Sequence, residues 1–235
     1  MPEGLERRRE LLRKVPLFAR LPPDALATLA QAATTTRLDA REELFHKGDA
    51  AAQVYVVTSG RLKVVTGSAE GDEAFLAILG PGDVVGELPM LTGGRRTASV
   101  VALEPCELLA LSRRDFLQLL RDRHEVAVEL VLALAERLIH ANEFVAEALF
   151  LAIPARLARK LLGLAESYGV EEGGSLRIDL KLFQGELADL VGVTRVSINK
   201  QMRAWTDEGV LRMERGEITI LDPMRLERLA GLVST

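Results

Sequence analysis

The stretch from His124 to Leu151, HEVAVELVLALAERLIHANEFVAEALFL, contains neither proline nor glycine. Apolar or small residues recur along it in steps of three and four, at Val131, Leu134, Leu138, Ala141, Val145 and Ala148. This heptad rhythm is typical of a helix that pairs with a partner along one seam. Roughly 28 residues at about 1.5 Å each give a rod of about 40 Å. We therefore expect a long dimerisation helix.

A second apolar row on the same stretch consists of Leu130, Ala133 and Phe144. This row leaves another face of the helix free to cover part of its own subunit. An ordinary buried helix is the competing interpretation of the pattern. The flanking sequence favours the paired helix, because strand-like segments precede it and helical segments follow it.

The composition limits the class of protein. With 235 residues and 48% hydrophobic content, one or two domains with a core each are expected. No apolar run reaches membrane-spanning length, and the charged segment from Met1 to Lys14 does not resemble a signal peptide. Cys106 is the only cysteine, which excludes an internal disulfide and suits a reducing compartment. A cytoplasmic protein without membrane contact is expected.

The net charge of −4 is unevenly distributed. Residues 1–152 hold 18 Lys and Arg against 22 Asp and Glu, whereas residues 153–235 hold 12 of each. Between Gly192 and Arg215, five basic residues face three acidic ones. A local basic surface is sufficient for contacts with nucleic acid phosphates, so the overall acidity does not exclude DNA binding.

Short apolar segments punctuated by glycine fill the region from Thr34 to Leu111. Strand candidates are Glu43–Asp49, Val54–Val57, Arg61–Val65, Phe75–Leu79 and Leu108–Leu111. Several short strands at regular spacing predict a closed antiparallel β structure, a roll or jelly roll. Ser112 then resembles the N-cap of a helix over Arg113–Leu120, and the long helix follows.

The region after Ile153-Pro154, where the long helix should break, has helical and hairpin signals. An amphipathic segment, Ala155–Ala165, leads to a connection over Gly169–Leu182 with one short strand. Two helical segments, Glu186–Val191 and Thr194–Glu208, flank the turn at Gly192-Val193. Val210–Arg215 and Glu217–Leu221 then form a plausible hairpin around Gly216. This order predicts a winged helix-turn-helix.

The second of these helices is the candidate DNA reader. Gly192 lies where the turn needs a permissive backbone, Thr194 can cap the helix, and Ile198 can plug the small core. The first turn should then point outward and carry polar side chains that reach base edges or phosphates. The predicted DNA-binding residues are Thr194, Arg195, Val196, Ser197, Asn199 and Lys200.

The order of β-rich domain, long helix and winged helix-turn-helix resembles the CRP/FNR family of bacterial transcription regulators, from about Pro16 onward. The resemblance implies an effector-gated, sequence-specific DNA-binding homodimer that acts on a palindromic operator with RNA polymerase. Arg195 and Lys200 match in kind the basic residues of the family's recognition helix. Val196 replaces the usual glutamate and could contact a thymine methyl instead. Phe183 is a second departure, because Thr or Ser is common there.

The segment Gly86–Ala98, GELPMLTGGRRTA, resembles the phosphate-binding cassette of cyclic-nucleotide-binding domains. Gly86 can leave backbone N–H groups open to an anion, and Glu87 can accept from a ribose hydroxyl. Arg96 supplies a cationic fork for a cyclic phosphate, and Thr97 adds a hydroxyl. The competing interpretation is a structural Glu87–Arg96 ion pair without a nucleotide.

The full set of predicted ligand-binding residues is Gly86, Glu87, Leu88, Arg96, Thr97 and Asn142. The resemblance places Ala141 and Asn142 where the family contacts the nucleobase, and only Asn142 can hydrogen-bond through its side chain. Cyclic AMP is the first expected effector and cyclic GMP the second. A ligand-independent regulator or a haem sensor using His140 is the alternative. The three histidines lack metal-ligand spacing, so no metal is expected.

The sequence thus predicts an α+β protein without enzymatic activity. It has an N-terminal antiparallel β-roll sensor, jelly-roll-like, over residues 1–122, and a dimerisation helix over 123–152. A winged helix-turn-helix for DNA binding follows over 153–235.

Overall fold

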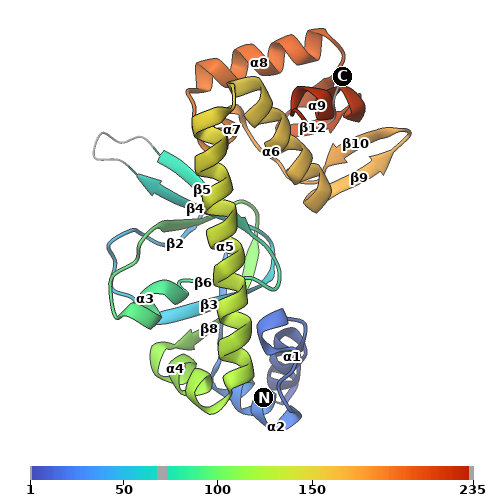
Figure 1. Ribbon diagram of the computed structural model, residues 1–235. Helices are drawn as coiled ribbons and strands as arrows, with labels where there is room; N and C mark the ends of the chain where they lie inside the picture. The colour runs from blue at the N-terminus through green and yellow to red at the C-terminus, as the bar shows by residue number, and fades with distance from the viewer. Residues whose placement is uncertain (1, 68–72, 233–235) are drawn as a thin grey trace. The chain divides into compact units, whose positions relative to one another are not determined.

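A computed structural model describes residues 2–67 and 73–232 of the chain. These residues form two compact units. One contains residues 2–67 and 76–139, and the other contains residues 140–232 together with the short segment 73–75. Both are shown in Figure 1 and are described separately. In the described part of the chain, no helix combines the length and apolarity that a bilayer span requires.

The first unit is built on two four-stranded antiparallel sheets. One sheet has the order β1-β8-β3-β6, and the other has the order β2-β7-β4-β5. The strand bounds are β1 Thr34–Leu38, β2 Glu43–Phe45, β3 Gln53–Ser59, β4 Leu62–Gly67, β5 Glu73–Leu79, β6 Val84–Val85, β7 Ser99–Ala102 and β8 Cys106–Ser112. The predicted antiparallel roll is confirmed, although the segment predicted as a strand over Glu43–Asp49 pairs only as far as Phe45.

Two hydrophobic cores hold this unit together. Leu38, Val57 and Leu108 from one sheet pack with Leu62 and Val100 from the other, which fills the interior of the roll. The second face of the β1-β8-β3-β6 sheet is covered by helices. These are α1 Pro2–Arg13, the 3-10 turn η1 Pro16–Phe18, α2 Pro23–Ala32, α4 Arg113–Asp122 and the first part of α5. Ser112 caps α4 by accepting from the Asp115 N–H, as predicted.

Helix α5 spans His124–Phe150, close to the predicted bounds, because no helix breaker occurs before Pro154. Its buried residues are Val126 and Leu130, which pack into the helix-covered core. Leu134, predicted on the partner-facing seam, is half-buried and packs against that core, so part of its side chain is already covered within the subunit.

The second unit contains the C-terminal part of α5 and the winged helix-turn-helix. Its further elements are α6 Ile153–Tyr168, β9 Gly169–Glu172, β10 Ser175–Ile178, α7 Gln184–Val191, α8 Arg195–Asp207, β11 Leu211–Glu214, β12 Glu217–Ile220 and α9 Pro223–Leu229. The strands form one sheet in the order β11-β12-β10-β9. The connection after α6 therefore contains two strands, a hairpin, where the sequence predicted one.

The small core of this unit explains the local sequence pattern. Leu187 and Ala188 of α7 and Ile198 of α8 are fully or almost fully buried. Trp205, seven residues after Ile198 and therefore on the same face of α8, is buried as well. Gly192 adopts φ +70°, the left-handed conformation that closes the turn between the two helices at little steric cost. Arg215 and Gly216, both with positive φ, turn the β11–β12 hairpin.

Candidate effector site and nucleic-acid interface

The predicted phosphate-binding cassette folds as a short helix between two glycine corners. Strand β6 ends at Val85, and Gly86 with φ +82° begins α3, which spans Glu87–Thr92. Gly93 with φ +76° ends the helix, and its N–H donates to the Pro89 carbonyl. A Cβ at position 86 would lie 2.2 Å from the Arg96 Nη1 atom. The left-handed φ therefore favours glycine at position 86, and a Cβ there would displace the end of the Arg96 side chain.

Arg96 is the central cation of the cassette, and only 5% of it is exposed. Its Nη1 donates to the Gly86 carbonyl at 3.1 Å and its Nη2 to the Gln53 carbonyl at 2.6 Å. The guanidinium carbon lies 3.9 Å from the centre of the Phe45 ring, a cation–π contact. The buried Nε has no hydrogen-bond partner among the described residues.

This environment favours an anion. Burial lowers the pKa of Arg96, and the charges of Tyr55, Asp49 and Glu87 oppose that shift. The two carbonyls that bind the guanidinium are neutral, so its positive charge is buried without a carboxylate bonded to it. A buried charge without a directly bonded counter-ion is costly, and a bound anion would reduce that cost.

Glu87 does not form the ion pair with Arg96 that the alternative interpretation predicted. The carboxylate is almost completely buried, and its Oε1 accepts from Nη1 of Arg137 at 2.7 Å. Nη2 of Arg137 donates to the Val84 carbonyl at 2.5 Å. Arg137 belongs to α5, so it links the long helix directly to the first residue of the cassette helix.

Sequence reasoning missed Arg137. One signal was available, because Arg137 lies four residues before Ala141 and therefore on the same helix face. Its partner Glu87 is fifty positions away, and no local pattern connects the two residues.

The remaining predicted ligand-binding residues are less enclosed. Leu88 on α3 and Thr97 near the end of the cassette are exposed. Arg95 is also exposed, and it donates to the Gly48 carbonyl at 2.8 Å. Asn142 belongs to the second unit and is exposed on α5. The structure thus brings together Gly86, Glu87 and Arg96, and it adds Arg137.

A row of exposed side chains runs along α5. Val131, Leu138 and Val145 are more than half exposed, as predicted for the seam. The predicted Ala141 and Ala148 are exposed as well, and a further exposed row with the same seven-residue repeat is formed by Val128, Ala135, Asn142 and Leu149. The row of Val131, Leu138 and Val145 and the row that contains Asn142 together have the three-and-four spacing of a heptad, in which Asn142 occupies an a position. Exposed apolar faces of this length are typical of protein–protein interfaces.

Helix α8 presents the predicted DNA-contacting residues. Thr194 is its N-cap and accepts from the Ser197 N–H at 3.3 Å, as predicted. The Ser197 hydroxyl lies 3.0 Å from the Thr194 hydroxyl and therefore also takes part in the cap. Arg195 and Lys200 are exposed, and 77% of Val196 is exposed. An apolar side chain held at the start of the helix is positioned for contact with an apolar group.

Asn199 departs from the prediction. It was expected to point outward with the other polar residues of the first turns, but it is half-buried and its Oδ1 is buried without a partner among the described residues. Asn199 follows Ile198, which faces the core, and it takes a position at the edge of that core. The expectation that the whole side chain points outward is therefore not met, and its contact with DNA stays a prediction.

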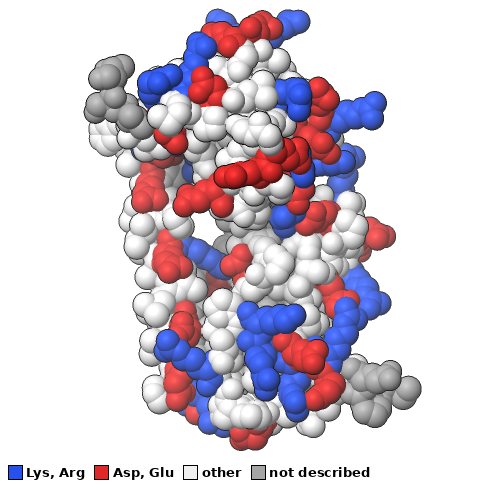
Figure 2. Space-filling model, turned by 90° about the vertical axis from the view of Figure 1, so that its right-hand side faces the viewer, with Lys and Arg blue, Asp and Glu red and all other residues white. Residues whose placement is uncertain are grey.

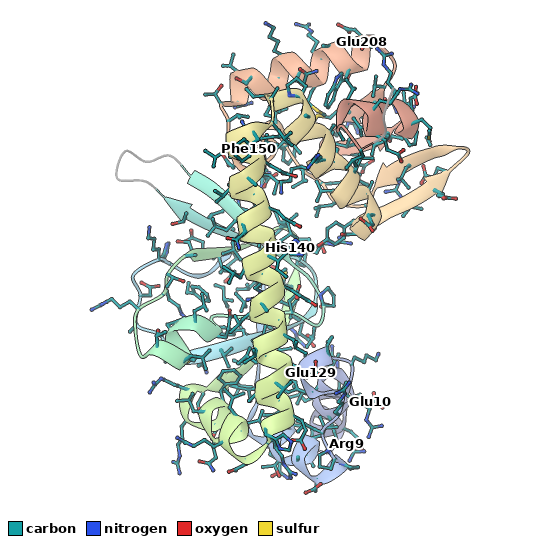
Figure 3. The ribbon with its side chains drawn as sticks, in the orientation of Figure 1. Arg9, Glu10, Glu129, His140, Phe150 and Glu208 are labelled. Atoms are coloured by element: carbon teal, nitrogen blue, oxygen red, sulfur yellow. The ribbon has the colours of Figure 1, made fainter. Side chains whose placement is uncertain are left out.

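The exposed basic side chains of α8 form no ion pairs with described residues. No carboxylate within residues 2–67 and 73–232 forms an ion pair with Arg195, Lys200 or Arg203. Figure 3 shows Glu208, at the end of α8, which pairs with Arg225 of α9 instead. Exposed cations that no described carboxylate neutralises give this helix a local positive charge, which suits contact with a polyanion.

His140, the candidate haem ligand, is exposed on α5 (Figure 3). Its Nδ1 lies 3.2 Å from a carboxylate oxygen of Glu143. In the part of the chain that the structure describes, no group of three or more His, Cys, Asp or Glu side chains is placed to hold a metal ion.

Two family models match the chain. A cyclic nucleotide-binding domain matches residues 35–123, and a Crp-like helix-turn-helix domain matches residues 155–229. The chain is 32% identical to the CRP-like cAMP-activated global transcriptional regulator of Mycobacterium tuberculosis, over 94% of this chain and 99% of that protein. It is 35% identical to the cyclic AMP receptor protein of Thermus thermophilus, over 92% and 96%.

Solved structures agree with these matches. The Thermus thermophilus catabolite activator protein is 33% identical and superposes with a TM-score of 0.52, covering 93% of this chain and 100% of that one. The c-di-GMP responsive regulator CLP of Xanthomonas campestris shares the fold, with a TM-score of 0.77 at 21% identity over 85% of this chain and 99% of that one. The chain belongs to the CRP/FNR family of effector-gated, DNA-binding transcription regulators.

Proposed function

We propose that the effector is a cyclic purine nucleotide, with cyclic AMP as the first candidate and cyclic GMP as the second. The observation that carries this proposal is the buried guanidinium of Arg96, which is bonded to neutral carbonyls and has one N–H without a partner among the described residues. A cyclic phosphate would supply the missing negative charge. The match to a cyclic nucleotide-binding domain and the names of the two relatives support the same ligand class.

Each cassette residue has a proposed role. Gly86 allows the α3 backbone to approach the phosphate, and Thr97 offers a hydroxyl to it. Glu87 accepts from the ribose 2′-hydroxyl, for which it must share its carboxylate with Arg137. Leu88, exposed on α3, covers the bound nucleotide from the solvent side. In this arrangement the sugar competes for a carboxylate that also holds α5.

Helix α5 is the element that would couple effector and DNA. We assign the homodimer interface to the row containing Val131, Leu138 and Val145, and we place the nucleobase near Asn142 of the further exposed row. A nucleotide that changes the Glu87–Arg137 contact would shift the helix on which both units depend. Effector and operator affinities would then be reciprocally coupled, typically by about 1–3 kcal/mol.

The DNA-reading role is assigned to the first turns of α8. Arg195 would donate to guanine, Val196 would contact a thymine methyl, and Lys200 would bind a base or a phosphate. Thr194 and Ser197 hold the start of the helix and can offer hydroxyls to the backbone of the DNA. Two copies related by a twofold axis would read successive major grooves about 34 Å apart in a palindromic operator.

The wider setting follows from this role. A regulator of this kind would act in the cytoplasm and contact RNA polymerase at its target promoters. It would need neither a metal ion nor catalytic activity.

Calorimetric titration of the dimer with cyclic AMP and cyclic GMP tests the proposal. Saturable binding of at least one nucleotide is expected, and Arg96→Ala should abolish it. Arg95→Ala is the matched control, because Arg95 is the adjacent but exposed arginine. Binding that survives in Arg96→Ala, or the absence of binding by either nucleotide, would contradict the proposal. A visible absorption band of the purified protein would indicate a haem sensor. Full operator affinity without any ligand would indicate a ligand-independent regulator.

A further inference from the structure

A second groove lies in the first unit, between helix α1 and strands β1 and β8. Its volume is about 420 Å³, within the usual range of small-molecule sites. The lining residues are Gly4, Arg7, Arg8, Leu11, Thr35, Arg37 and Glu107. None of them belongs to the cassette Gly86–Thr97. Figure 2, in which the right-hand side of Figure 1 faces the viewer, shows several Lys and Arg side chains close together in its lower half, where α1 lies.

The fold explains why these residues converge. Gly4, Arg7, Arg8 and Leu11 have the i, i+3, i+4, i+7 spacing of one helix face. On the sheet, Arg37 pairs directly across from Glu107, and Thr35 pairs across from Leu109. Leu109 packs in the core beneath the helices, and residues two apart on a strand share a face. Thr35, Arg37 and Glu107 therefore face the side of the sheet on which α1 packs.

The groove has an excess of positive charge. Three arginines line it with one carboxylate, so the formal charge of the lining is +2. Glu107 is shared, because its Oε1 accepts from Arg7 Nη2 at 2.8 Å and its Oε2 from Arg37 Nε at 3.1 Å. Arg8 uses its Nε to donate to the Ala30 carbonyl at 2.8 Å. Its two terminal nitrogens make no hydrogen bond or ion pair within the described residues.

The space beside Arg8 is open because residue 4 is a glycine. A Cβ built at Gly4 would have a single neighbour within 4 Å, the Arg8 Nη1 atom at 4.0 Å. Glycine lowers helix stability by about 1 kcal/mol relative to alanine, and the φ of Gly4 is not one that demands it. A side chain at this position would enter the groove next to the unpaired guanidinium end.

We infer that this groove binds a small phosphorylated compound carrying at least two negative charges. Guanidinium forks match phosphate oxygens in a bidentate geometry, and an arginine retains its charge at all relevant pH values. Arg8 supplies the free fork, Arg7 and Arg37 supply the nitrogens that Glu107 leaves unused, and the Thr35 hydroxyl can donate. A dianion would balance the +2 lining, whereas a neutral ligand would not.

Titration of the full-length dimer with inorganic pyrophosphate tests this inference. The Arg96→Ala background removes the cassette as a phosphate site. Saturable binding is expected in that background, and Arg8→Gln or Arg37→Gln should weaken it at least tenfold. Arg13→Gln is the matched control, because Arg13 is exposed on the same helix but does not line the groove. If all three variants bind alike, or the background protein does not saturate, the inference is wrong.

Gly4→Leu is a second variant that keeps every charge. It should fill the groove and weaken pyrophosphate binding at least tenfold while the melting temperature stays equal or rises. Unchanged binding by this folded variant would show that pyrophosphate does not occupy the groove and that the arginines serve only to hold α1 against the sheet. Parallel titrations with ADP distinguish the source of the phosphate: tighter binding of ADP indicates a nucleotide site, and equal or weaker binding indicates inorganic polyphosphate. ADP and pyrophosphate both failing to bind would overturn the inference.

Discussion

Arg96 in the first unit and Arg195 in the second carry the same guanidinium in opposite surroundings. Arg96 is buried, stacked on Phe45 and bonded to two carbonyls, whereas Arg195 is exposed and forms no ion pair with a described residue. The first arrangement holds the charge in one fixed place, which suits a single small ligand. The second leaves charges free to meet a long polyanion, where screening by salt is strong. In the proposed function, the same side chain therefore serves selective ligand binding in one unit and electrostatic capture of DNA in the other.

The largest effect should come from the core of the reader. Trp205→Ala removes a buried indole and should lower the free energy of unfolding of the second unit by about 3–5 kcal/mol. Operator binding should be lost at 37 °C, while cyclic nucleotide binding by the first unit persists. Calorimetric melting and nucleotide titration measure the two effects. Met224→Ala, at an exposed methionine, is the control. If Trp205→Ala lost nucleotide binding as fully as operator binding, the two units would not behave independently.

The cassette should be sensitive to one added methyl group. Gly86→Ala combines a left-handed φ with a Cβ 2.2 Å from Arg96 Nη1, so it should destabilise by about 2 kcal/mol or more and displace the guanidinium. Gly93→Ala has a similar φ, but the nearest atom to its Cβ would be Arg113 Nη2 at 3.6 Å, so about 1 kcal/mol is expected. Nucleotide affinity should fall at least tenfold only in Gly86→Ala. Equal affinities in the two variants would refute the proposed role of Arg96.

The reader should separate base contacts from phosphate contacts. Arg195→Ala should reduce discrimination at one base pair of each half-site by about 1–3 kcal/mol. If Lys200 binds a phosphate, Lys200→Gln should weaken all sequences alike and reduce the slope of log affinity against log salt by about 1 per subunit. Competition binding with single-base operator variants at several salt concentrations measures both effects. A uniform loss for Arg195→Ala would make that residue a phosphate contact instead.

The smallest effect should be a pH dependence in the β-roll. Burial raises the pKa of the Cys106 thiol above its ordinary value of 9.0. The folded state therefore holds this proton more tightly than the unfolded state. The resulting stabilisation is complete below the unfolded pKa and is lost as pH rises through the folded pKa. Melting temperatures of wild type and Cys106→Ala between pH 7 and 10 should converge at the alkaline end, and parallel curves would contradict the assignment.

Local sequence chemistry predicted most of the elements. Pro154 ends α5, Ser112 caps α4, and Gly192 closes the turn before α8, because each of these residues imposes its own backbone conformation. The partial burial of Leu134 on α5 was not predicted, for a different reason. Leu134 and Ala135 both fit a helical repeat, and only packing of Leu134 against the subunit's own core selects which of them faces outward.

Long-range contacts account for the parts of the site that the sequence did not reveal. Arg137 donates to Glu87, which lies fifty positions earlier in the sequence. This pairing depends on how the first part of α5 packs against the roll. Asn199 turns toward the core because Ile198 beside it is buried, which depends on the rotation of α8 over α7. The predicted cassette residues Gly86, Glu87 and Arg96 come together because ten residues and two glycine corners suffice to position them.

The most direct measurement is the affinity of the dimer for its operator duplex with and without saturating cyclic nucleotide, in wild type and in Arg96→Ala. We expect the nucleotide to change the wild-type affinity by about 5- to 150-fold, the range typical of allosteric coupling, and to leave the variant unchanged. A wild-type affinity that is the same with the cassette empty and occupied would contradict the account.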